Sequence, residues 1–304
     1  MQQIGPDHNS LAKSATSGHW RVQSSWSMIS PHRKPGETMK RLHLLAIAFS
    51  LSCCAALAHA ETVLITGSST GIGLEFARQY AARGWTVYAT HHYAQTPDSL
   101  AQLQKQHPDK VRIELLDVTK PEHLAALKKK LGAAPIDVLL NNAGLIRTEP
   151  LIPREGNRNQ KLSTLDYGLG ASFMDVNVFG PLRVIETFAD NVKASATKKM
   201  VTISSAAGSV TGPVPAAGDH YWYRSSKAAL NSVMKLVAAD MKPAGVTVVF
   251  FHPGGVAVES FAGQNVPGLQ PPSVVIPKLM KVIDEVTIAD TGRFLNNEGK
   301  DQPW

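Results

Sequence analysis

Apolar residues between positions 61 and 304 form short runs that alternate with longer segments of helical periodicity. Short runs of apolar or β-branched residues predict buried strands of a parallel sheet, and the segments between them predict helices that cover it. The predicted strands are 63–66, 86–90, 111–116, 136–140, 200–203, 246–251 and a short one at 293–295. The alternation of strand and helix predicts one α/β domain with a doubly wound parallel sheet of the Rossmann type.

Local signals set the predicted ends of the helices. The first helix is expected to end at Gly84, and the next to run from an N-cap at Thr96 to about His107. Residues 119–122, Thr-Lys-Pro-Glu, predict a capping box for a helix that ends at Gly132. Later helices are predicted over a long segment that ends near 194, over 221–240 and over 273–286.

Segments rich in proline, glycine or polar residues interrupt this pattern. Residues 147–164 predict an irregular polar loop, and residues 208–218 lead from the fifth strand into the next helix. Residues 253–272 follow the sixth strand, at the edge of the sheet where ligands bind in such folds. From its length and position we predict that this segment is a mobile substrate lid.

The first 60 residues have a different pattern. From Met39 a short basic start precedes an apolar run to Ala58 and a small residue at Ala60. This order predicts a signal peptide over 39–60 that is cleaved after Ala60. The run is about fifteen residues long, shorter than the roughly 20 that span a bilayer, so the alternatives are a short membrane anchor or a buried core helix. Residues 1–38 predict a disordered extension or an unused upstream start.

A cleaved leader predicts an exported domain, periplasmic or secreted, whereas an uncleaved one would leave the domain cytoplasmic or membrane-anchored.

Six of the 31 Lys and Arg residues but only two of the 24 acidic residues lie in the first 60 positions, so the domain itself is nearly balanced in charge. It has no basic block interleaved with aromatics, which argues against nucleic acid as a partner. Both cysteines, Cys53 and Cys54, lie in the apolar run, so the domain has no disulfide or thiolate metal site.

Three glycines, Gly67, Gly71 and Gly73, separate the first strand from the first helix. Such a turn directs the helix N-terminus, with its free N–H groups and positive dipole end, at a ligand above the sheet. Glycine lacks a Cβ, so a pyrophosphate can approach the backbone closely. An ordinary glycine-rich loop would explain three glycines alone, but the order of strand, turn and helix favours a dinucleotide site.

A second candidate site combines Tyr223, Lys227 and Ser205. Tyr223 and Lys227 are four residues apart and therefore share one face of a predicted helix, although an amphipathic face with a solvent-reaching lysine would explain the pair alone. Ser205 follows the fifth strand, where it faces the ligand crevice. The set suits carbonyl reduction, in which a phenol activated by the nearby ammonium transfers a proton and the serine hydrogen-bonds the carbonyl oxygen. The sequence shows no clustered metal ligands, so no metal is expected.

Further motifs follow the other strands: Asp117-Val118 after the third, residues 141–144 (NNAG) after the fourth, and Pro253-Gly254 after the sixth. In order and spacing, the motifs resemble the short-chain dehydrogenase/reductase family over essentially all of 61–304. This resemblance implies a nicotinamide dinucleotide cofactor and a catalytic set of Asn177, Ser205, Tyr223 and Lys227, with Asn177 ordering a water that contacts the lysine. The cofactor-binding residues that it implies are Gly67, Ser69, Gly71, Ile72, Gly73, His92, Asp117, Val118, Asn142, Ala143, Gly144, Tyr223, Lys227, Pro253, Gly254 and Val256.

Two stretches narrow the resemblance. Residues 223–231 (YRSSKAALN) and 292–304 are similar to the branch of the family that includes C-factor and Sniffer. The gap between Ser205 and Tyr223 is wider than is usual in the family, which predicts a remodelled rim of the active site and leaves the substrate open.

The form of the cofactor depends on the end of the second strand. An acid there would bind the ribose hydroxyls of NAD, whereas a base suits the phosphate of NADP. The sequence has His91 and His92 and no acid before Asp98, so NADP is favoured and NAD stays open. His92 is at the position where relatives often carry arginine. Two solvated loop histidines are the alternative interpretation.

We therefore expect an enzyme that reduces a carbonyl of a small molecule, or oxidises the matching alcohol. The alternative is a C-factor-like signalling or dinucleotide-binding protein in which turnover is secondary. A complete set of four catalytic residues argues against that alternative, because a binding protein has no use for all four. Membrane contact is expected only through an uncleaved leader, and the sequence leaves a homo-oligomer open.

Overall fold

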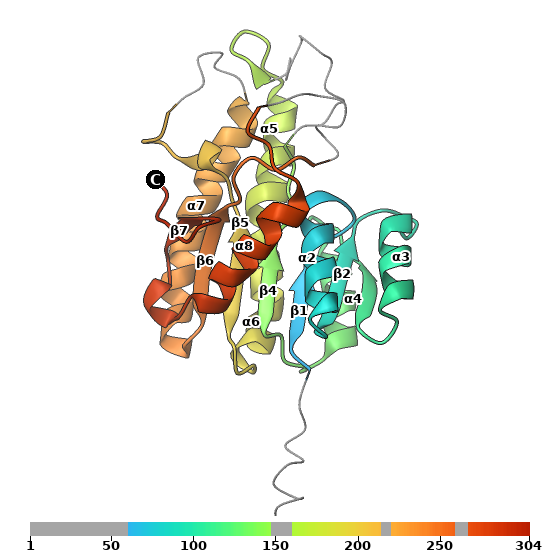
Figure 1. Ribbon diagram of the computed structural model, residues 1–304. Helices are drawn as coiled ribbons and strands as arrows, with labels where there is room; N and C mark the ends of the chain where they lie inside the picture. Colours follow the sequence, from blue (N-terminus) through green and yellow to red (C-terminus); the bar gives the residue numbers. More distant parts are fainter. Residues whose placement is uncertain (1–59, 147–159, 214–219, 259–266) are drawn as a thin grey trace, which may run out of the picture. The chain divides into compact units, whose positions relative to one another are not determined.

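The computed structural model describes residues 60–146, 160–213, 220–258 and 267–304. Seven parallel strands form one sheet in the order β3-β2-β1-β4-β5-β6-β7 (Figure 1). The strands are β1 (Thr62–Ile65), β2 (Thr86–His91), β3 (Val111–Leu115), β4 (Val138–Asn141), β5 (Lys199–Ile203), β6 (Thr247–His252) and β7 (Phe294–Asn296). The strand order reverses direction between β1 and β4, which is where ligands bind in doubly wound sheets. The predicted α/β fold is confirmed.

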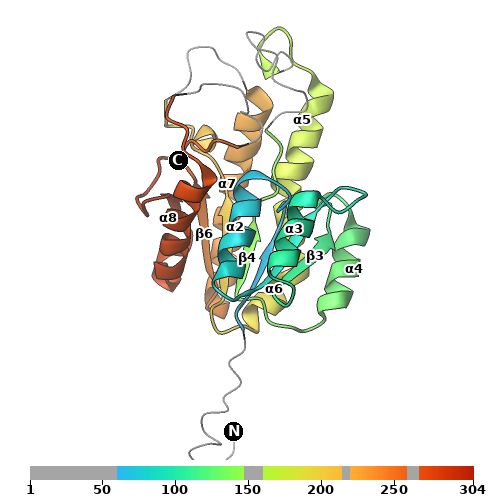
Figure 2. The same ribbon diagram turned by 45° about the vertical axis from the view of Figure 1, so that its right-hand side comes forward.

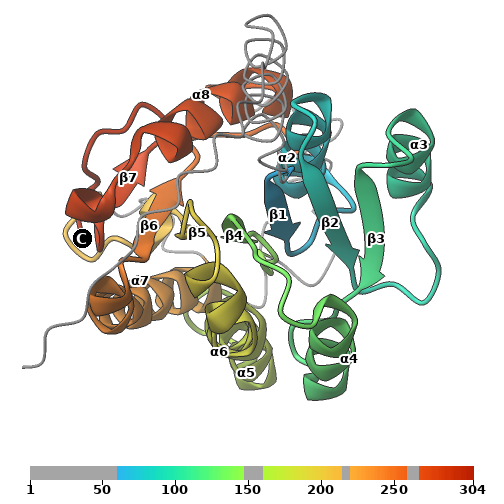
Figure 3. The ribbon, with the colours of Figure 1, turned by 90° about the horizontal axis from the view of Figure 1, so that it is seen from below.

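Helices cover both faces of the sheet. Helices α2 (Gly71–Ala82), α3 (Asp98–Gln106) and α8 (Pro272–Glu285) lie on one face (Figures 2 and 3). The other face carries α4 (Pro121–Leu131), α5 (Tyr167–Met174), α6 (Gly180–Lys193) and α7 (Tyr221–Met241). No helix in the described ranges is both long enough and apolar enough to cross a membrane.

Two hydrophobic clusters fill the spaces between the sheet and its two helix layers. Successive side chains of a strand point to opposite faces, so Val63 and Ile65 of β1 join the cluster under α2 and α8, while Leu64 joins the cluster under α4, α6 and α7. All three side chains are fully buried. Burial on both faces explains why the central strands are continuous apolar runs rather than alternating ones.

Two predicted helix caps are wrong. Helix α3 begins at Asp98 with Pro97 as its N-cap residue, so Thr96 lies one position too early. Helix α4 begins at Pro121, and its N-cap residue is Lys120, which makes no side-chain capping bond. Instead of capping the helix, Thr119 hydrogen-bonds Asp117 Oδ1 through its hydroxyl at 2.7 Å and through its backbone N–H at 2.9 Å. A short hydroxyl side chain can satisfy either a turn or a helix end, and here the turn after β3 takes it.

The predicted ends at glycines are confirmed. Gly132 is the C-cap residue of α4 with a φ of 57°, and Gly84 follows α2 with a φ of 85°. Both angles lie in the left-handed region that glycine adopts without a steric penalty. The long helix predicted to end near 194 is α5, a π-helical turn (Asp175–Phe179) and α6, which run continuously up to the C-cap Ala194.

Some predictions lie wholly or partly outside the described residues. The predicted leader and N-terminal extension cover 1–60, of which only residue 60 is described. Residues 147–159 of the polar loop, 214–219 of the segment before α7 and 259–266 of the predicted lid are likewise outside. At the base of the predicted lid, Val256 pairs with Gln270 in a parallel bridge.

Candidate active site

The glycine turn after β1 is sterically restricted. Gly67 has a φ of 68°, and a Cβ there would lie 2.9 Å from the Cα of Ala143. At Gly73, a Cβ would lie 2.2 Å from the carbonyl oxygen of Gly67 and 2.5 Å from Asn142 Nδ2. Contacts this short do not occur for real side chains, so only glycine fits at these two positions. The turn is therefore compressed against the segment after β4, which leaves the N-terminus of α2 at the carboxyl edge of the sheet.

Side chains after β4 brace this turn. The Asn142 amide donates to the carbonyl oxygens of Thr66 and Gly67, at 3.0 and 2.8 Å. In return, the Thr66 hydroxyl accepts the backbone N–H groups of Asn142 and Ala143, both at 3.0 Å. On the other side, the backbone of Gly67 donates to Thr90 Oγ1 at 3.3 Å. The two motifs that the sequence separates by more than seventy residues form one rigid platform.

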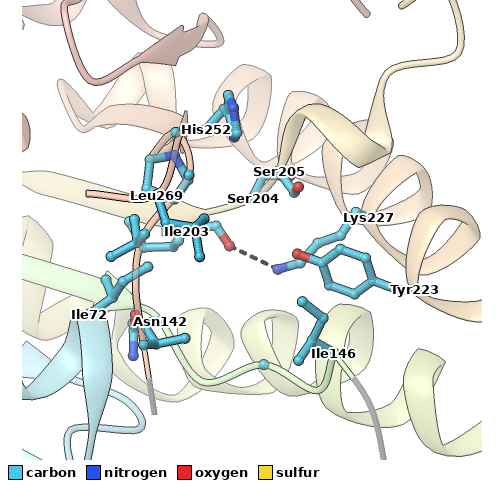
Figure 4. A pocket seen from close by; sticks show the side chains of 16 residues that line it. Ile72, Asn142, Ile146, Ile203, Ser204, Ser205, Tyr223, Lys227, His252 and Leu269 are labelled. Atoms are coloured by element: carbon cyan, nitrogen blue, oxygen red, sulfur yellow. Dashed lines mark hydrogen bonds between the residues drawn. The ribbon is translucent and has the colours of Figure 1, made fainter. Parts of the chain in front are cut away.

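The three residues of the second candidate site meet in one cavity of about 270 Å³ (Figure 4). Ser205 follows β5, and Tyr223 and Lys227 come from the first two turns of α7. The predicted residues that line the cavity are Ile72, Asn142, Gly144, Ser205, Tyr223, Lys227, Pro253, Gly254 and Val256. The cavity therefore combines part of the predicted cofactor set with most of the predicted catalytic set.

Lys227 is buried, with only 5% of its surface exposed. Its Nζ donates to the carbonyl oxygen of Ile203 at 3.0 Å, the bond drawn as a dashed line in Figure 4, and lies 5.9 Å from the centre of the Tyr223 ring. Burial disfavours the ammonium and lowers the pKa of Lys227 to about 8. Near neutral pH, this amine can therefore take up or release a proton at little cost.

The Tyr223 phenol differs from the sequence-based expectation. Burial raises the pKa of Tyr223 above its ordinary value, and a hydrogen bond with the Ser205 side chain opposes that rise only in part. The expected lowering of this pKa by the Lys227 ammonium is not found: the two causes of the shift are burial, which raises the pKa, and the Ser205 hydrogen bond, which lowers it. In this state the phenol keeps its proton at neutral pH. Ser205 Oγ also accepts the backbone N–H of Ala207 at 3.1 Å, so its hydroxyl is held in place between the backbone and the phenol.

Asn177 lies in the π-helical turn between α5 and α6 and is fully buried. Its amide clamps the backbone of Leu145, accepting from the N–H at 2.6 Å and donating to the carbonyl at 2.8 Å. The same amide nitrogen donates to Ser226 Oγ of α7 at 2.9 Å. The Asn177 side chain therefore joins the loop after β4 to the helix that carries Tyr223, and it does not line the cavity.

The other predicted cofactor residues lie outside the cavity, in the glycine turn, directly after β4, and beyond the ends of β2 and β3. They are Gly67, Ser69, Gly71, Gly73, Ala143, His92, Asp117 and Val118.

Burial alone would raise the pKa of the Asp117 carboxyl, but two hydrogen bonds from Thr119 and the charges of His92 and His123 hold it below its ordinary value. The exposed His92 ring packs on Tyr93, with ring centres 4.2 Å apart. Asp117 and His92 are thus electrostatic neighbours at the ends of β3 and β2.

Several residues that shape the cavity were not predicted from the sequence. His252 ends β6 and lines the cavity, and Ile146 and Leu269 contribute apolar surface. His252 could have been found, because it is the last residue of a strand whose carboxyl end faces the crevice. Ile146 and Leu269 carry no such signal, since they lie in irregular segments whose path depends on contacts elsewhere in the fold.

Comparisons with known proteins agree with this geometry. A family model described as short chain dehydrogenase matches residues 61–266. The C-signal protein of Myxococcus xanthus is 30% identical over 181 residues, which cover 60% of this chain and all of that protein. The NADPH-bound carbonyl reductase from chicken fatty liver superposes with a TM-score of 0.71 and 26% identity, covering 81% of this chain and 99% of that one.

Two further structures extend the comparison. An NADP-bound short-chain dehydrogenase/reductase from Burkholderia multivorans has a TM-score of 0.68 and 28% identity, covering 81% of this chain and all of that one. The carbonyl reductase Sniffer of D. melanogaster superposes equally well, with a TM-score of 0.68 and the same two coverages, but its 22% identity shows the fold alone.

Proposed function

The chain belongs to the short-chain dehydrogenase family and is an NAD(P)-dependent oxidoreductase, and from this premise we propose that it reduces an aldehyde or ketone with NADPH, with Tyr223 as the proton donor. The observation that carries the proposal is the cavity itself. It places a protonated phenol, a hydroxyl and a buried amine beside Ile72, Gly144 and the Pro253–Val256 segment.

The residues present fit a dinucleotide. The turn at Gly67 and Gly73 leaves no room for a Cβ, so the backbone is free to approach a phosphate closely. The first turn of α2 has no acidic residue, and Thr70 makes no side-chain cap, so the positive end of the helix dipole is not neutralised locally. We assign the phosphates to this turn and the nicotinamide end to Gly144, Pro253, Gly254 and Val256. When bound, the cofactor supplies or accepts a hydride at a carbon atom.

Proton transfer falls to Tyr223. Because burial raises its pKa, the phenol is protonated at neutral pH and can give its proton to an oxygen that becomes an alkoxide. The Ser205 hydroxyl donates a hydrogen bond to the same oxygen and stabilises the negative charge that develops there. Lys227 lies beside the phenol with a pKa of about 8, so it can restore the proton to the tyrosine after each turnover.

NADP is preferred over NAD in this proposal. No acid follows β2 before Asp98, and the exposed His92 is near that strand end. The carbonyl reductase from chicken fatty liver is bound to NADPH, and the Burkholderia multivorans protein is bound to NADP.

The test is turnover of the full-length chain with NADPH or NADH and a panel of aldehydes, ketones and quinones, followed by absorbance of the reduced cofactor. Tyr223→Phe removes the proton donor but little volume, so turnover should fall by several orders of magnitude while NADPH affinity changes little. Turnover of the Phe variant within a few-fold of the wild type would exclude the proposed role of Tyr223.

A signalling or binding function is the second candidate, favoured by the similarity to C-signal. It predicts that the chain binds the cofactor but reduces none of the panel faster than the Tyr223→Phe variant does. The same experiment therefore separates the two functions.

A further inference from the structure

Gln160 is a buried polar side chain beside the candidate active site, with 3% of its surface exposed. Its Oε1 accepts the backbone N–H of Tyr223 at 3.0 Å. Its Nε2 donates to the backbone carbonyl of Ile146 at 3.3 Å. The two ends of one amide therefore hold a residue that lines the cavity from α7 and another that lines it from the loop after β4.

At the end of helix α7 where Tyr223 lies, the N-cap residue provides no side-chain cap. That residue, His220, has a φ of 67°. The first N–H groups of a helix have no partner within the helix, and a side chain of the N-cap residue commonly accepts the N–H at the third helical position. Tyr223 is at that position, and Gln160 supplies the missing acceptor from 63 residues away.

A second amide makes the same connection one turn deeper in the protein. Asn177 binds both backbone groups of Leu145 and also donates to Ser226 of α7. Gln160 and Asn177 thus form two bridges between the same pair of segments, one at Ile146 and Tyr223 and the other at Leu145 and Ser226. Two such bridges fix both the distance and the angle between the loop and the helix, which a single one could not.

We propose that Gln160 is a positioning residue that fixes the main chain of Tyr223 relative to the substrate side of the cavity. The proposal rests on the proposed role of Tyr223 in proton transfer. Without the Gln160 acceptor, the first turn of α7 is free to fray, and the phenol moves with it. A displacement of about 1 Å at a reacting group can reduce a rate by roughly a hundredfold. Without the Gln160 donor, only Ile146 is released, so the shape of the substrate pocket changes instead.

Two variants separate these effects. Gln160→Leu removes both hydrogen bonds at similar volume, and kcat should fall by about ten- to a hundredfold. Gln160→Glu keeps an acceptor for the Tyr223 N–H and, assayed at a pH at which the new carboxyl is ionised, loses the donor to Ile146. For this variant, kcat should stay within about threefold of the wild type, while KM for the carbonyl substrate rises by about tenfold. The affinity for NADPH, measured by fluorescence titration, should change less than threefold in both.

Amide hydrogen exchange provides a readout that does not depend on activity. In cofactor-free, full-length protein, amides of residues 221–226 should exchange about tenfold faster in Gln160→Leu than in the wild type, and at the wild-type rate in Gln160→Glu. Gln106→Leu, at an exposed position of α3, is the matched control and should change neither exchange in 221–226 nor kcat.

Equal loss of kcat in the Leu and Glu variants would overturn the proposal, because it would indicate a general structural defect. The proposal would also be overturned if Gln160→Leu turned over substrate at the wild-type rate while Tyr223→Phe was inactive. If Tyr223→Phe itself keeps its turnover, the proposed function fails first, and the exchange experiment still tests the contact between Gln160 and Tyr223. If the Leu variant does not fold, the kcat and KM of the Glu variant test the proposal in its place.

Discussion

Removal of the buried amine at Lys227 should change how the stability of the protein depends on pH. The substitution is Lys227→Met, which keeps a chain of similar length and removes the titrating group. The pKa of Lys227 is lowered from 10.5 to about 8 by burial. Between these two values the unfolded state binds more protons than the folded state, so this group makes the folded state more stable as pH rises through the window.

The magnitude follows from the size of the shift. One pKa unit corresponds to about 1.4 kcal/mol, so burial of the Lys227 ammonium costs about 3 kcal/mol at any pH below the folded pKa. That cost disappears progressively between pH 8 and pH 10.5. The variant never has this cost but loses the hydrogen bond from Nζ to Ile203, a loss that does not depend on pH. Relative to the variant, the wild type should therefore increase its free energy of unfolding by about 3 kcal/mol as the pH rises from 8 to 10.5.

Urea unfolding of both cofactor-free proteins at several pH values between 7 and 10 measures this difference, and groups common to both proteins cancel. Lys242→Met, at an exposed position at the end of the same helix, controls for the loss of a positive charge. If the difference between wild type and Lys227→Met were the same at pH 7 and pH 10, the burial of a charged amine at this position would be refuted. Loss of turnover in the variant would be expected in either case.

Other predictions concern the cofactor and the leader. Gly73→Ala should destabilise the protein by about 1–3 kcal/mol and weaken NADPH binding, because the new Cβ meets the Gly67 carbonyl; unchanged Tm and affinity would contradict the steric argument. His92→Ala should reduce the preference for NADPH over NADH severalfold in titrations, and tighter binding of NADH by the wild type would contradict the NADP assignment. In the native host, N-terminal sequencing should find a chain that begins at Glu61 outside the cytoplasm, whereas an intact start at Met39 in the cytosol would exclude export.

The sequence by itself was sufficient for those features that depend on local pattern. Apolar runs separated by helical segments predicted all seven strands to within one or two residues, because a strand buried on both faces must be continuously apolar. The spacing of Tyr223 and Lys227 placed both on one helix face, since four residues make about one helical turn. Gly67 and Gly73 marked the tight turn after β1 because no other residue tolerates such close contacts there.

Tertiary structure decided what depends on contacts between distant segments. Thr119 can cap a helix or bind Asp117 with equal ease, and only the packed turn after β3 selects the second. The direction in which the pKa of Tyr223 moves depends on whether burial or a neighbouring charge is stronger, and burial is a property of the assembled cavity. Gln160 has no local signal at all, because its importance comes from two backbone groups that the fold brings to either end of its amide.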